Sequence, residues 1–130
     1  MISGFDHVAI TASDLDAICN FYGDVLGARI DAEYPWNGRP AVRRVFVGGA
    51  LLNIHQQGNG IDLVARTPTP GAADLCFRWD GTIEGAQALI EAKGVTVIEG
   101  PAPRTSHDGK RGASIYFNDP DGNLIELMAA

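Results

Sequence analysis

The sequence is poor in several kinds of residue, and each shortage limits what the chain can be. Cysteine occurs only at Cys19 and Cys76, which lie too far apart in the chain for a zinc knuckle or a redox pair. We therefore expect two reduced thiols in buried packing positions. No apolar run reaches the roughly 18 residues that suggest a membrane helix, and no signal-like start is present. These absences predict a cytoplasmic protein without a membrane partner.

Basic residues are also scarce, since 10 Lys and Arg face 16 Asp and Glu for a net charge of -6 at pH 7. The basic residues form no cluster that could follow a phosphate backbone, so nucleic acid is not expected as a partner. With 45% apolar residues, the 130-residue chain is long enough to bury a core of its own. We expect a single domain covering residues 1–130.

An internal repeat organises this domain. The stretch Phe5–Asp31 aligns without gaps with Ala73–Glu99, and each copy has a β-rich run followed by an amphipathic helix. Each helix is expected to end at a glycine, Gly27 or Gly94. Aligning these glycines sets the repeat offset at 94 - 27 = 67 residues, one fewer than the 73 - 5 = 68 of the gap-free pairing, and we use the glycine register because it marks a structural event. Three strand candidates follow each helix. The pattern predicts an α+β fold of two tandem βαβββ modules, about residues 1–60 and 71–130, joined by a Pro/Gly connector.

Cap residues and prolines suggest where the elements begin and end. Ser13 is expected to cap the first helix, with Asp16 three residues later, and either Asp80 or Thr82 to cap the second. The segment 95–100 is expected to form a strand. Two irregular loops are expected as well, one around residues 32–38 and one over residues 100–112, because prolines and glycines interrupt both segments.

Strand alternation places four possible metal ligands at related positions. His7 and Asp74 belong to the first strand of each module, whereas His55 and Glu126 belong to the last strands. Taken singly, each has a plainer explanation as a solvated, capping or hydrogen-bonded residue. Together, two imidazoles and two carboxylates suit a divalent ion such as Zn, Ni, Co, Mn or Fe(II).

The position equivalent to Glu126 in the first module has two candidates. Aligning Gly49 with Gly122 puts Asn53 opposite Glu126, whereas a shift of two residues puts His55 there. Both side chains point to the same face of the strand, so strand alternation leaves the choice open.

Long segments at both ends of the chain give it a family resemblance. The stretches "DHVAITASDLDAICNFYGDVLG" and "NDPDGNLIEL", with the paired modules between them, resemble the vicinal-oxygen-chelate (VOC) superfamily. That group includes glyoxalase I, extradiol dioxygenases, fosfomycin-resistance enzymes and bleomycin-binding proteins. The stretches "LLNIHQQG" and "TPTPGAADLCF" are similar to a virulence-associated glyoxalase-like subgroup.

The resemblance implies a cupped mixed sheet that holds a metal, and a homodimer is the expected assembly. His7 matches the family's first-strand ligand and Glu126 its last-strand ligand and base, whereas Asp74 stands where histidine is usual and His55 at or near a glutamate position. The implied activity is that of a lactoylglutathione lyase-like lyase or isomerase acting on a small vicinally oxygenated or electrophilic substrate. The alternatives are an Fe(II) extradiol dioxygenase of a catechol and a resistance protein that binds a small molecule without catalysis.

The substrate-binding candidates are aromatic or polar residues in loops or on the strand faces that carry the ligands. They are Tyr34, Trp36, Asn53, Arg104, His107 and Tyr116.

Overall fold

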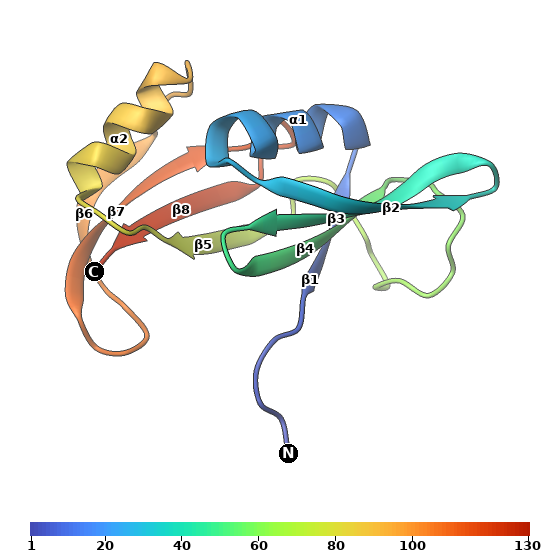
Figure 1. Cartoon of the computed structure of the whole chain (residues 1–130), viewed down its shortest axis with the longest axis horizontal. Coiled ribbons are helices and arrows are strands. Elements are labelled where there is room, and N and C mark those ends of the chain that lie inside the picture. Colours follow the sequence, from blue (N-terminus) through green and yellow to red (C-terminus); the bar gives the residue numbers. More distant parts are fainter. The chain divides into compact units, whose positions relative to one another are not determined.

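Each half of the chain folds into one helix and one four-stranded mixed sheet (Figure 1). The computed structural model describes all residues from Met1 to Ala130 and separates them into two units, Met1–Ala72 and Ala73–Ala130. Neither helix has the length and apolarity needed to cross a lipid bilayer.

The first unit contains β1 (Val8–Ala12), α1 (Leu15–Leu26), β2 (Arg29–Trp36), β3 (Arg39–Val47) and β4 (Ala50–Gln56). Its strand order is β1-β4-β3-β2, in which β1 runs parallel to β4 and the other neighbours are antiparallel.

The second unit contains β5 (Asp74–Arg78), α2 (Ile83–Ala92), β6 (Glu99–Thr105), β7 (Arg111–Asn118) and β8 (Leu124–Ala129). Its order, β5-β8-β7-β6, repeats the topology of the first unit, with β5 parallel to β8. The expected α+β fold with two βαβββ modules is confirmed.

Helix α1 covers one face of the first sheet (Figure 1). Its buried side chains are Leu15, Ile18, Cys19, Tyr22 and Val25, and they face the apolar side of the strands. Burying each large apolar side chain stabilises the fold by about 1.5 to 3 kcal/mol relative to leaving it exposed. The opposite face of the sheet is therefore the one left for polar chemistry.

The residue that caps α1 is Asp14 and not Ser13. The Asp14 carboxylate accepts a hydrogen bond from the Ala17 backbone N–H at 3.1 Å. Ser13 lies one residue before the cap, and its carbonyl oxygen accepts a hydrogen bond from Gln56 Nε2 at 2.8 Å. The helix end was predicted correctly, because Gly27 adopts the left-handed conformation with φ 65°.

Arg43 holds α1 to the sheet by its charge. Its side chain is only 15% exposed and donates hydrogen bonds to Asp16 at 2.7 Å and Glu33 at 2.8 Å. These partners raise the Arg43 pKa further above its usual range, although burial alone would lower it. Arg43 is therefore a structural residue on the helix-covered face and is not available to a substrate.

Helix α2 begins after Thr82, one of the two predicted caps, whose hydroxyl accepts a hydrogen bond from Gly85 N–H at 3.1 Å. Its buried side chains are Ile83, Ala86 and Ile90. The fully buried apolar strand residues of this unit are Ile115, Phe117 and Ile125, which lie on the α2 side of β7 and β8.

Two predicted loops form strands over part of their length, whereas residues 37–38 and 106–110 are turns or irregular as predicted. The predicted strand at residues 95–100 is displaced, because β6 spans Glu99–Thr105 and includes Pro101 and Pro103. Similarly, Tyr34 and Trp36 lie within β2 and not in a loop. Both β2 and β6 are the last strands of their sheets, where a proline removes no hydrogen bond from a central ladder.

The loop before β8 is fixed by buried polar side chains. Asp119, which is 5% exposed, accepts hydrogen bonds from the backbone N–H groups of Asp121 and Asn123, both at 3.0 Å. Asn123 in turn accepts a hydrogen bond from the Ala73 backbone N–H at 2.9 Å. The loop therefore sets the start of β8 against the start of β5.

Candidate functional site

Glu126 lies in the middle of β8, on the face opposite the apolar core of the second unit. Its Cα partners on the neighbouring strands are Cys76 of β5 and Tyr116 of β7. Both side chains hydrogen-bond to the Glu126 carboxylate. The neighbouring side chains Ile125 and Leu127 are buried on the other face, which explains how a charged residue fits into an apolar strand.

Cys76 was expected to be a buried packing residue, but it is exposed, whereas Cys19 is buried as predicted. Partial desolvation and then the neighbouring Glu126 charge raise the pKa of the Cys76 thiol to about 11. The thiol is thus protonated at neutral pH and acts as a donor to the carboxylate. The signal for this role was present in the sequence, since alternation puts Asp74, Cys76 and Arg78 on one face.

Tyr116 connects Glu126 to a cation. Arg104 of β6 donates from Nε to the Tyr116 hydroxyl at 2.7 Å, and its guanidinium carbon lies 5.4 Å from the centre of the phenol ring. Burial raises the Tyr116 pKa, Arg104 opposes this shift and Glu126 adds to it. The phenol therefore stays protonated, accepting from Arg104 while it donates toward Glu126.

The equivalent face of the first sheet carries polar atoms without partners. Asn53 Oδ1, His55 Nδ1 and Arg44 Nε are all buried, and none makes a hydrogen bond. Asn53 pairs with Arg44 on β3 and with Ala9 on β1, whereas His55 pairs with Thr11. Buried polar atoms without partners cost free energy, so such a row is typical of a surface that binds a ligand or water.

His7 precedes β1 and is exposed. Its Nδ1 lies 2.7 Å from the Asp6 carboxylate. A hydrogen bond from Nδ1–H to a carboxylate orients the ring and leaves Nε2 as the atom with a free lone pair. This is how a histidine that binds a metal is usually held.

The strand register distinguishes Asn53 from His55. The repeat offset of 67 makes Ala9 equivalent to Cys76, because 9 + 67 = 76. Ala9 pairs with Asn53 and Cys76 pairs with Glu126. Asn53 is therefore the structural counterpart of Glu126, and His55 lies two residues further along the same face.

The pKa of His55 predicts how the stability of the protein depends on pH. Burial, and next the charge of His7, lowers the His55 pKa below its ordinary value of 6.5. The unfolded chain then binds a proton that the folded chain does not, so stability falls as the pH drops through 6.5 toward the folded-state pKa.

We expect metal-free protein to lose stability as the pH falls below 6.5, and His55→Gln to remove part of this loss. Urea denaturation of both proteins at a series of pH values measures the effect. Equal slopes of unfolding free energy against pH for the two proteins would contradict it.

The remaining predicted site residues are distributed between the units. Tyr34 lies on the Asn53 face, hydrogen-bonds to Arg44 and is 49% exposed. Trp36 lies at the tip of the β2–β3 hairpin, near Gly60, and is also 49% exposed. His107 occupies the β6–β7 turn and is exposed. Asp74 is the first residue of β5, two residues before Cys76 on the Glu126 face, and it is exposed.

Within neither unit do three His, Cys, Asp or Glu side chains gather closely enough to hold a metal ion.

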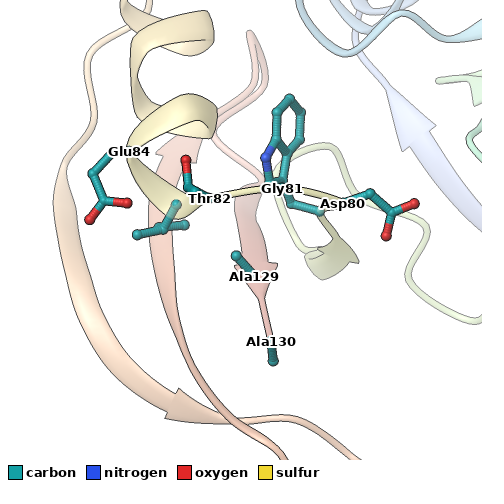
Figure 2. A pocket seen from close by; sticks show the side chains of 8 residues that line it. Asp80, Gly81, Thr82, Glu84, Ala129 and Ala130 are labelled. Carbon is teal, nitrogen blue, oxygen red and sulfur yellow. The ribbon is translucent and has the colours of Figure 1, made fainter.

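A separate pocket lies at the start of α2 (Figure 2). Its lining runs from Trp79 to Glu84 and includes Ala129 and Ala130, so none of the predicted ligands or binding residues takes part. Figure 2 shows the side chains of Asp80 and Glu84 pointing away from each other. The two carboxylates therefore do not converge on a common ligand.

Comparison with known proteins gives close relatives along nearly the whole chain. Virulence protein STM3117 of Salmonella typhimurium is 39% identical over 127 residues, covering 98% of this chain and 84% of the relative. Its crystal structure superposes with a TM-score of 0.86 at 36% identity, covering 99% and 98% of the two chains. Glyoxalase domain-containing protein RDO1 of Mycosarcoma maydis is 38% identical, covering 98% of this chain and 69% of the relative.

More distant relatives carry the names of enzymes or resistance proteins. An ethylmalonyl-CoA/methylmalonyl-CoA epimerase of Cereibacter sphaeroides is 26% identical, covering 98% of both chains. A mutant of the fosfomycin resistance protein FosX of Listeria monocytogenes, complexed with Mn(II) and 1S,2S-dihydroxypropylphosphonic acid, is 25% identical with a TM-score of 0.64, covering 98% of this chain and 90% of FosX. The family model for these proteins matches residues 4–127, and the chain belongs to the Glyoxalase/Bleomycin resistance protein/Dioxygenase superfamily.

Proposed function

We propose that the protein is a metal-dependent, glyoxalase-like lyase or isomerase that acts on a small substrate with vicinal oxygens or an electrophilic carbon. The observation that carries this proposal is Glu126, a mid-strand carboxylate flanked by two protonated donors, Cys76 and Tyr116. A carboxylate held in this way has a fixed orientation, as proton transfer next to a carbonyl requires.

The metal ligands in this proposal come from equivalent strand faces of the two units. They are His7, Asp74 and Glu126, with a fourth donor from β4. His55 is the fourth ligand expected from the sequence, but the register favours Asn53, whose unpartnered Oδ1 is a suitable oxygen donor. Nitrogen and oxygen donors of this kind suit Zn, Ni, Co, Mn or Fe(II). The two units that supply them could belong to one chain or to two chains of a homodimer.

A divalent ion bound there would polarise the substrate's oxygens as a Lewis acid. The chain itself would supply the proton transfer. Glu126 would take a proton from one carbon and return it to the adjacent carbon, while the Tyr116 hydroxyl and the Cys76 thiol keep the carboxylate in place. The family's epimerase member supports this reaction class, because inverting the configuration of a carbon, like a proton shift between adjacent carbons, requires a bond to a substrate carbon to break and form again.

The first test is metal binding by gently purified protein, measured by elemental analysis and by calorimetry after metal reconstitution. We expect one tightly bound divalent ion per site, and His7→Ala should weaken its binding by about 10- to 100-fold or more. The control is His107→Ala, because His107 is an exposed histidine in a hairpin turn.

Each outcome has a consequence for the proposal. Equal metal binding by the His7 and His107 variants would refute the site, and no binding by the wild type would point to a metal-free ligand-binding protein. Turnover of catechols with iron and oxygen, in place of hemithioacetal turnover, would identify a dioxygenase.

A further inference from the structure

An aromatic ring, a carboxylate and a hydroxyl hold the Arg44 side chain in place on the first sheet. Its guanidinium carbon lies 5.7 Å from the centre of the Phe46 ring, and the Oδ1 of Asp31 lies 3.5 Å from its Nε. The Tyr34 hydroxyl hydrogen-bonds to the same guanidinium group. The side chain is thus fixed over the sheet although 35% of it is exposed.

One donor of this fixed cation has no acceptor. Arg44 Nε is buried and makes no hydrogen bond, since the contact with Asp31 has only ion-pair distance. The adjacent Asn53 also has a buried Oδ1 without a partner. The unsatisfied donor therefore lies beside the β4 position that corresponds to Glu126.

We infer that Arg44 binds an anionic oxygen of the ligand, so that the substrate is a small carboxylate whose second oxygen lies toward Asn53. A ligand carboxylate that takes the place of Asp31, which lies 3.5 Å away, would satisfy Nε–H through a charge-assisted hydrogen bond, and a planar guanidinium group suits such an acceptor. The inference deepens the proposed function by naming the substrate class. It rests on that function only for the reaction, because the anion site needs no metal.

Arg29 provides a matched control. It also lies over Phe46, with its guanidinium carbon 4.8 Å from the ring centre, and it is 3.9 Å from Asp31. Its side chain is 67% exposed, however, so solvent can satisfy its donors. Arg29→Lys and Arg44→Lys both keep the charge while removing Nε–H, but only the second removes the buried donor.

The experiment is calorimetric titration of the metal-free 130-residue chain with oxalate, whose two carboxylate groups place oxygens on adjacent carbons. We expect saturable binding to the wild type, an affinity loss on the order of tenfold in Arg44→Lys, and less than about twofold in Arg29→Lys. Thermal melting of both variants checks that they fold.

NMR provides a second measurement, because the Arg44 Nε–H signal, assigned by its absence in Arg44→Lys, should shift as oxalate is added to the wild type. Absence of oxalate binding, equal losses in the two variants or an unmoved Nε–H signal would overturn the inference. Metal binding is measured separately, so a failed anion site and a failed metal site give different results.

Discussion

Glu126→Gln should lose most of its affinity for divalent metal, by at least about 100-fold, while the protein keeps its fold. The substitution preserves the shape of the side chain but removes the negative charge that a metal would neutralise. Cys76 and Tyr116 can still donate to the amide oxygen, so the strand pairing of Glu126 should survive. Calorimetric titration with metal and circular dichroism measure the two properties.

The control for this substitution is Glu99→Gln. Glu99 is exposed on β6 and pairs with Tyr116 from the other side, so the same chemical change is made one strand away. Wild-type metal affinity in Glu126→Gln, or an equal loss in Glu99→Gln, would show that Glu126 is not a ligand. Any hemithioacetal-converting activity of the wild type should disappear in Glu126→Gln, because the base is gone.

Gly100→Ala should destabilise the protein by about 3 kcal/mol or more. Gly100 has φ 99°, which disfavours a side chain, and a Cβ atom there would overlap the Ser114 carbonyl oxygen on β7. A backbone atom cannot move aside as a flexible side chain can, so the β6–β7 pairing must shift. Urea denaturation gives the change in unfolding free energy.

Gly109→Ala separates the two causes. Gly109 lies in the turn of the same hairpin with φ 82°, but a Cβ atom there would meet nothing within 4 Å. We expect this variant to lose only the 1 to 2 kcal/mol or so that a left-handed conformation costs a residue with a side chain. Similar losses in the two variants would mean that the Ser114 contact adds nothing.

Local patterns in the sequence were sufficient for much of this structure. The repeat, the helix-ending glycines and the alternation of strands predicted both modules and placed Asp74 and Glu126 on one face. Alternation has a period of two, however, and Asn53 and His55 are two residues apart, so no pattern within β4 could separate them. The parallel pairing of β1 with β4 separates them, and that pairing is set by tertiary contacts.

Tertiary structure also decides two features that the sequence pattern did not predict, the strand β6 and the different roles of Arg43 and Arg44. Prolines predicted a loop over residues 100–112, because the sequence does not show that β6 would be a terminal strand. Arg43 and Arg44 are adjacent in the sequence, yet Arg43 contacts α1 and Arg44 belongs to the polar face. Which of the two would be structural depended on where α1 packs.

The hydrogen bond between the Ala73 backbone and Asn123 also bears on the order in which the second unit folds. Tyr116 and Glu126 belong to neighbouring antiparallel strands joined by a short loop, whereas Ala73 and Asn123 are 50 residues apart. Closing the longer loop costs more chain entropy, so the β7–β8 hairpin should form before β5 joins its edge. Glu126 would then meet Tyr116 early and Cys76 late, and its surroundings would be complete only when the most distant strand pairing of the unit has formed.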